Sequence, residues 1–244
     1  MTRIVVTLLC LGAVVAAVVL WAAPLLERVG VSGAVLPWTE ACSVGEGDAS
    51  FALSLDQAQR ATTAVALESR DDVEDVEVDV QDVESDALDL LRDGPADGPG
   101  PVLTCSVSGS DDLVEEDLND SGLTPRAENV LEEMRDVFGE LSVGGFEPGG
   151  VDEGHGENSA HYQGRAVDVF FRPVSEENRR AGWVLTNWLV AHAGDLDVDV
   201  IIFDDRIFSS RLPQWRDYNS PDPDNEILRH LDHVHVDVRR GSGD

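Results

Sequence analysis

The fold is decided by His161–Asp168 (HYQGRAVD) together with Asp232–Val238 (DHVHVDV) near the C-terminal end. In the second stretch valines alternate with polar residues, which predicts a strand with His233 and His235 on one face and the valines on the other. His161 and Asp168, which begin and end HYQGRAVD, together with His235 of DHVH offer two imidazoles and one carboxylate. This ligand set suits Zn²⁺ and leaves the fourth tetrahedral position open for a water, as in catalytic zinc sites.

His161, Asp168 and His235 are therefore the predicted zinc ligands. His233 stands two residues before His235 and is predicted to act as the base that moves protons beside the metal. Asp237 shares the face of both histidines. It either orients an imidazole by a hydrogen bond to the nitrogen that does not bind the metal, or lies exposed at the end of the strand.

The remaining pattern predicts an α+β fold with an antiparallel sheet, because helices and strands alternate irregularly. Periodicity and capping residues predict helices over 53–69, 126–138 and 175–192. The predicted strands are 73–80, 141–146, 166–171, 197–203, 206–208 and 233–238. Residues 212–229 are expected to form a long polar loop.

The N-terminal segment is strongly apolar. No residue from Ile4 to Leu26 is charged, which is the length of a membrane-spanning helix. Arg3 before it predicts an N-terminus on the inner side of the membrane. The competing interpretation is a secretory signal peptide, although its apolar region is usually shorter. We expect an uncleaved anchor and a single-pass protein of the cell membrane whose C-terminal domain lies outside the cytoplasm. If the segment is cleaved, the protein is secreted.

Cys42 and Cys105 lie on the side that this segment would export, where disulfides persist. We expect a bond between them, stabilising the fold by about 4 kcal/mol on the chain-entropy estimate. If the chain is not exported, two unrelated thiols are the alternative. The expected organisation is a transmembrane anchor over 1–28, a small disulfide-tied α+β module over 29–107, an acidic linker over 108–122 and a zinc domain over 123–240.

The charge balance excludes one class of partner. The chain carries 48 acidic and 17 basic residues, for a net charge of −31. Such a surface repels nucleic acid and anionic lipid, so we expect no nucleic-acid partner.

The pattern SxHxxGxAxD over 159–168, followed by DHVH over 232–235, resembles the zinc peptidases grouped around D-alanyl-D-alanine carboxypeptidases, lysostaphin-type endopeptidases and the hedgehog signalling domain. The resemblance implies a hedgehog-like or D-Ala-D-Ala-peptidase-like domain with zinc on His161, Asp168 and His235. It also implies that His233 is the catalytic base.

The chain is still more similar to a C-terminal domain of secreted actinobacterial proteins of this kind. The shared motifs over 123–239 are LTP at 123–125, GGF at 144–146, GRA at 164–166 and HLDHVHV at 230–236. Related sequences carry an arginine after the Gly-Gly-aromatic motif, a candidate for stabilising the oxyanion. Here Glu147 stands in its place, and its charge opposes that role.

Several further residues are candidates to contact substrate or to support the ligands: Ser159, Arg165, Asp237, His230 and Glu147, with Arg165 and Arg206 as candidate replacements for the missing cation. His155 lies in a Gly-rich loop. We expect it to be solvated, with capping of the cleft or binding of a second metal as the alternatives.

Two functions follow from these residues. The first is a membrane-anchored zinc hydrolase outside the cytoplasm that cuts peptide bonds in peptidoglycan stem peptides. The second is a catalytically degenerate module that keeps zinc for stability and binds the cell wall or a partner. Glu147 favours the second.

Overall fold

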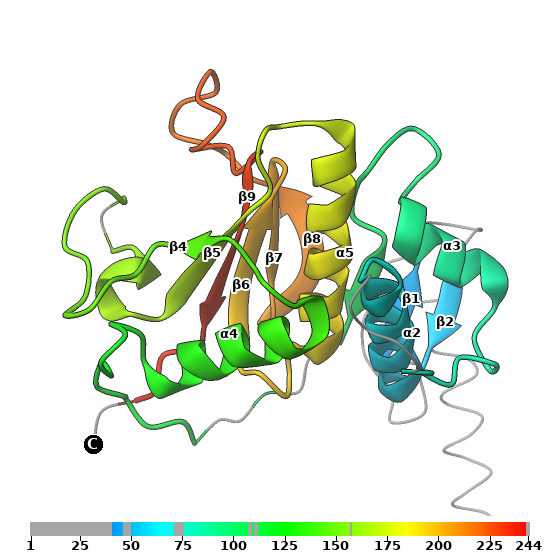
Figure 1. Ribbon diagram of the computed structural model, residues 1–244, viewed down its shortest axis with the longest axis horizontal. Coiled ribbons are helices and arrows are strands. Elements are labelled where there is room, and N and C mark those ends of the chain that lie inside the picture. Colours follow the sequence, from blue (N-terminus) through cyan, green and yellow to red (C-terminus); the bar gives the residue numbers. More distant parts are fainter. Residues whose placement is uncertain are drawn as a thin grey trace, which may run out of the picture. The chain divides into compact units, whose positions relative to one another are not determined.

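The structure is a computed structural model that describes residues 41–45, 50–70, 76–106, 109, 112–156 and 158–242. Residues 40–244 form one compact α+β unit with two antiparallel sheets (Figure 1).

The larger sheet has six strands in the order β4-β5-β9-β6-β7-β8 (Figure 1). Its strands are β4 (Val143–Gly144), β5 (Ala166–Phe170), β6 (Val198–Phe203), β7 (Arg206–Ser209), β8 (Leu212–Asp217) and β9 (His233–Val238). All neighbouring strands in this sheet are antiparallel. The sequence-derived expectation of an antiparallel sheet agrees with this arrangement.

Two helices pack against this sheet, α4 (Pro125–Phe138) and α5 (Glu176–His192). Thr124 caps α4 by accepting a hydrogen bond from the Ala127 amide, and Pro125 occupies the first turn. Ser175 caps α5 in the same way. The predicted helices thus begin where their capping residues place them.

The two faces of β9 have different roles. Val234, Val236 and Val238 are buried in the hydrophobic core, to which α5 also contributes Trp183 and Trp188. Because side chains alternate along a strand, the histidines of β9 lie on the opposite face. The valine face holds the sheet against the helices and leaves the histidine face for chemistry.

The smaller sheet has the order β2-β1-β3, formed by β1 (Cys42–Val44), β2 (Phe51–Leu53) and β3 (Leu103–Cys105). It is accompanied by α2 (Leu55–Glu68) and α3 (Ser85–Asp93). Cys42 lies opposite Cys105 in the β1–β3 register, and the two form a disulfide with a Cα–Cα distance of 4.0 Å. The expected bond is confirmed.

This small module packs on the larger one through α2, which contacts α5. Trp188 Nε1 donates to Thr63 Oγ1 at 3.2 Å, and Trp215 Nε1 donates to the Leu103 carbonyl at 2.8 Å. Two indoles of the larger module, Trp188 and Trp215, therefore have their polar atoms satisfied by acceptors of the small module.

Two local expectations were wrong, and one helix was not expected. Residues 212–217 form strand β8 and not a loop. The sequence did not indicate this strand because an edge strand with mostly exposed side chains lacks the apolar alternation of a half-buried strand. Residues 76–80 form no strand; Val76 is exposed, so the alternation of valine and acid buries no continuous face. Helix α3 was not expected at all.

The expectation of a transmembrane anchor and a single-pass membrane protein is also corrected. Among the described residues, none of the helices combines the length and the apolar character needed to cross a membrane. The apolar segment that suggested the anchor, residues 4–26, lies outside the described residues.

Candidate metal centre

The register between β5 and β9 brings two of the predicted ligands together. Asp168 lies directly opposite His235, and Phe170 lies opposite His233. Residues directly opposite each other in an antiparallel pair have side chains on the same face of the sheet, with Cβ atoms about 5 Å apart. A carboxylate and an imidazole from distant parts of the sequence thereby meet without any loop to position them.

His161 comes from the short 3₁₀ helix η2 (Ala160–Gln163) that precedes β5. Ser159 caps this helix by accepting a hydrogen bond from the His161 amide at 3.3 Å. Gly164 ends it in the left-handed conformation, with φ +61°, where a Cβ would lie 2.6 Å from the Gly122 carbonyl oxygen. A glycine is thus required for the chain to turn into β5 immediately after the histidine.

Three nitrogen and oxygen atoms converge at nearly equal distances. His161 Nε2 lies 3.0 Å from His235 Nδ1 and 3.2 Å from Asp168 Oδ1, and the last two atoms are 3.1 Å apart. All three residues are buried. Ligands at 2.0–2.1 Å from a tetrahedral zinc ion lie about 3.3 Å from one another, so this triangle has nearly the required size.

The outer nitrogens of both imidazoles are already engaged. His161 Nδ1 donates to the Gly145 carbonyl at 2.8 Å, and His235 Nε2 lies 3.5 Å from Asp237 Oδ2. Each ring therefore turns an unprotonated nitrogen toward Asp168 when both rings are neutral. Three lone pairs facing one another repel, and a bound cation removes the repulsion. The described residues thus fit a divalent metal.

The electrostatics of the cluster also favour a positive charge. Burial opposes ionisation of Asp168, but the neighbouring imidazoles of His161 and His235 hold its pKa well below the usual range. Burial likewise opposes protonation of His235, yet Asp168 and Asp237 raise its pKa to about 9.

His233 faces the same cluster with a different partner. Its Nδ1 donates to Asp232 Oδ1 at 2.7 Å, and its Nε2 lies 3.9 Å from Asp168 Oδ1. Asp232 Oδ2 accepts a hydrogen bond from Arg172 Nε at 2.6 Å, and the Arg172 guanidinium lies 4.0 Å above the ring of Phe170. The outer nitrogen of His233 is thus a fixed donor, which leaves Nε2 free to accept a proton.

Two further histidines lie beside these residues. The ring centroid of His230 is 4.7 Å from that of His233, and its Nδ1 is a buried atom without a hydrogen-bond partner among the described residues. Burial and the neighbouring His233 lower the pKa of His230 to about 3. His155 stacks on His161 with centroids 4.0 Å apart. Burial also lowers the pKa of His155.

The structure separates the other predicted site residues from this cluster. The Glu147 side chain is exposed, and none of the described ion pairs or hydrogen bonds joins it to the histidines. Arg165 donates to Gln163 and to the Val238 carbonyl, at the other end of β9. Arg206 pairs with Asp217 at 2.7 Å. Neither arginine supplies the missing cation at the metal centre.

The sequence did not point to Arg172, and His155 was expected to be solvated. Arg172 has no motif that marks it, since its contact with Asp232 depends on the β5–β9 pairing. Asp232 belongs to the DHVH motif, and its place beside His233 was the available signal. His155, His161 and Asp168 each offer a ligand atom within 4.8 Å of the others, and this group could hold a metal ion.

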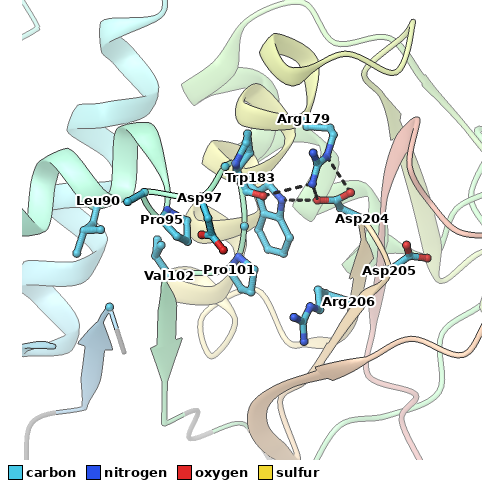
Figure 2. A pocket seen from close by; sticks show the side chains of 15 residues that line it. Leu90, Pro95, Asp97, Pro101, Val102, Arg179, Trp183, Asp204, Asp205 and Arg206 are labelled. Carbon is cyan, nitrogen blue, oxygen red and sulfur yellow. Dashed lines mark hydrogen bonds and ion pairs between the residues drawn. The ribbon is translucent and has the colours of Figure 1, made fainter. Parts of the chain in front are cut away.

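A larger concavity lies elsewhere, between the small module and the β6–β7 turn (Figure 2). Its volume is about 640 Å³, and it is lined by residues of the loop 95–102 together with Arg179, Trp183 and Asp204. Asp204 accepts hydrogen bonds from Arg179 Nη2 at 2.6 Å and from Trp183 Nε1 at 3.0 Å (Figure 2). These polar groups satisfy one another, and among the predicted site residues of the described chain only Arg206 lines this pocket.

Comparison with known protein families shows a similarity to part of the chain. The family model described as VldE, C-terminal domain matches residues 119–227. The matched segment includes His161 and Asp168 and ends before His233 and His235. No curated protein and no solved structure matches the chain.

Proposed function

We propose that the protein is a zinc-dependent hydrolase of peptide bonds, with His161, Asp168 and His235 as the metal ligands. The observation that carries the proposal is the triangle of His161 Nε2, Asp168 Oδ1 and His235 Nδ1, with sides of 3.0–3.2 Å. Two imidazoles and a carboxylate are a ligand set that zinc hydrolases use.

Zinc bound by these three atoms would polarise a substrate carbonyl and lower the pKa of a bound water. His233 supplies the base, because its Nδ1–H is held by Asp232 and its Nε2 faces the ligands. His233 Nε2 accepts a proton as water adds to the carbonyl carbon. It then delivers the proton to the leaving nitrogen as the C–N bond breaks, so that the base returns to its starting form.

Arg172 and Asp232 position this base. The carboxylate of Asp232 accepts from both side chains, and its pKa is lowered by these hydrogen bonds against the opposing effect of burial. A charged carboxylate favours the tautomer of His233 in which Nε2 is free. Arg172 keeps that carboxylate in place.

The proposed substrate class is peptidoglycan stem peptides, and its support is the resemblance of SxHxxGxAxD and DHVH to wall-active zinc peptidases. Peptides of this class carry carboxylates, which a chain of net charge −31 repels. Their approach to the site therefore depends on local cations. Arg172, whose side chain is 49% exposed, is such a cation beside the base.

A second candidate is a zinc-stabilised binding module without activity. It is favoured by the exposed Glu147 in place of the expected arginine and by the engagement of Arg165 and Arg206 elsewhere. Without a cation near the developing oxyanion, the metal alone would have to stabilise that charge.

Full-length protein incubated with purified peptidoglycan, with and without a chelator, separates the two. A hydrolase releases new amines, and both the chelator and His161→Ala stop the release. His233→Ala should retain one zinc per chain and lose the activity. Stoichiometric zinc with no amine release from the parent supports the binding module instead, and absence of bound zinc in the parent would refute both candidates.

A further inference from the structure

His155 lies near the proposed metal centre, and the proposed reaction does not use it. Its ring lies parallel to that of His161, with centroids 4.0 Å apart and an angle of 22° between the planes. One of its ring nitrogens lies within 4.8 Å of the ligand atoms of His161 and Asp168. It therefore stands on the side of His161 where a further ligand could approach.

The position of His155 is fixed through its backbone by Tyr162. The His155 amide donates to Tyr162 Oη at 3.0 Å, and the Tyr162 hydroxyl donates to the His155 carbonyl at 2.6 Å. Tyr162 follows His161 in η2. One short helix thus carries a metal ligand and the side chain that holds His155 over it.

We propose that His155 is a fourth, displaceable protein ligand that closes the metal centre by taking the position a reacting water needs. This inference rests on the proposed metal site. A zinc ion with four protein ligands is of the closed, structural type, whereas three ligands leave a position for water. Exchange of His155 for water then converts a closed form of the centre into an open one.

The distances require a small movement of the loop. Ligand atoms in a tetrahedral zinc site are about 3.3 Å apart, so a nitrogen at up to 4.8 Å must approach by roughly 1.5 Å. Gly154 and Gly156 flank the histidine, and a Cβ at either glycine would meet nothing within 4 Å. Open space at these glycines therefore allows the His155 ring to slide over the His161 ring toward the proposed metal position.

The two hydrogen bonds to Tyr162 determine how readily the ring leaves. If they break, the backbone of His155 is released, and the open form gains population. If they persist while the ring coordinates metal, the closed form combines tight metal binding with little turnover. Tyr162→Phe removes the hydroxyl and keeps the ring, so it should weaken the closed form without removing the ligand.

The test compares the parent with His155→Ala, Tyr162→Phe and the control Asp152→Ala, whose side chain is exposed in the same loop. Zinc affinity is measured by competition with a chelator, and the Co²⁺-substituted proteins are compared by visible absorption. We expect His155→Ala to lower zinc affinity roughly tenfold or more and to change the Co²⁺ spectrum. Tyr162→Phe should shift both in the same direction by less, and Asp152→Ala should match the parent.

Parental affinity and an unchanged Co²⁺ spectrum in His155→Ala would overturn the proposal. His161→Ala separates this failure from failure of the metal site itself. If His161→Ala loses stoichiometric metal while His155→Ala behaves as the parent, the three-ligand centre stands and only the role of His155 is wrong. If His161→Ala binds metal as the parent does, the proposed metal site is wrong and the inference is overturned with it.

Discussion

Gly145→Ala should weaken metal binding more than tenfold, because the backbone at this glycine lies directly against the proposed ligands. Gly145 has φ +82°, and a Cβ there would lie 2.3 Å from His161 Cε1, 2.5 Å from its Nδ1 and 3.1 Å from Asp168 Oδ2. To reach ordinary contact near 3.4 Å the His161 ring must move by about 1 Å. Zinc sites tolerate deviations of only about 0.2 Å in ligand distance.

The same substitution also breaks a supporting interaction. The Gly145 carbonyl accepts the Nδ1–H of His161, and a shifted ring weakens this bond. Loss of such a partner typically lowers metal affinity by about 10–100-fold, so the combined effect should exceed tenfold. Chelator competition on the folded protein measures this directly.

Gly149→Ala is the matched control. Gly149 also has a positive φ, +90°, but a Cβ there would meet nothing within 4 Å. Both variants therefore incur a similar backbone strain of about 1–2 kcal/mol, and only one displaces a ligand. Equal zinc affinity in Gly145→Ala and Gly149→Ala would refute the assignment of His161 as a ligand held by this backbone.

Three other predictions concern the base, the small module and the end of α5. Asp232→Asn should lower turnover about 10–100-fold while one zinc per chain is retained, measured by amine release and metal analysis, since it weakens the hold on His233 Nδ1; full turnover would contradict that role. Replacing Cys42 and Cys105 with alanine should lower the free energy of unfolding by about 4 kcal/mol in denaturant titrations, because the disulfide joins residues 63 apart; an unchanged midpoint would count against this estimate. Burial lowers the pKa of His192, which stacks on Trp188, so its contribution to stability is complete above about pH 6.5 and is lost as the pH falls through the folded pKa. His192→Gln should reduce the slope of unfolding free energy against pH in that window. Identical slopes in parent and variant would show that folding does not lower the pKa of His192.

Much of the larger module could be predicted from sequence because its signals are local. The alternation of valine and histidine in β9 determined both its conformation and its two faces, and capping residues located α4 and α5. The ligand positions followed from motif spacing and resemblance. Their convergence required the register that places Asp168 opposite His235, and nothing local in either strand specifies that register.

The features that sequence did not predict depend on tertiary contacts. Arg172 acquires its partner only because β5 and β9 are adjacent, and His155 reaches the cluster only because Tyr162 holds its loop. Strand β8 is a polar edge strand without a buried face. Its Trp215 is partly buried, and the indole N–H donates to the Leu103 carbonyl of the small module. A pattern method that searches for burial within one segment cannot find such elements.

The packing of the small module bears on how the centre is supported. Helix α5 contacts β6 and β9 on one side and α2 on another, so the valine face of the sheet is held by a helix that is itself packed against the disulfide-bonded module (Figure 1). Gln59 of α2 donates to Asp195 at 2.7 Å, just beyond the end of α5. Removing the module would leave Trp188 without its hydrogen bond to Thr63 and expose apolar surface on α5. Strands β5 and β9 carry the proposed ligands Asp168 and His235 on one face, and their geometry depends on the other face remaining covered. The small module therefore contributes to the proposed metal centre by supporting the sheet, although the three proposed ligands all lie in the larger module.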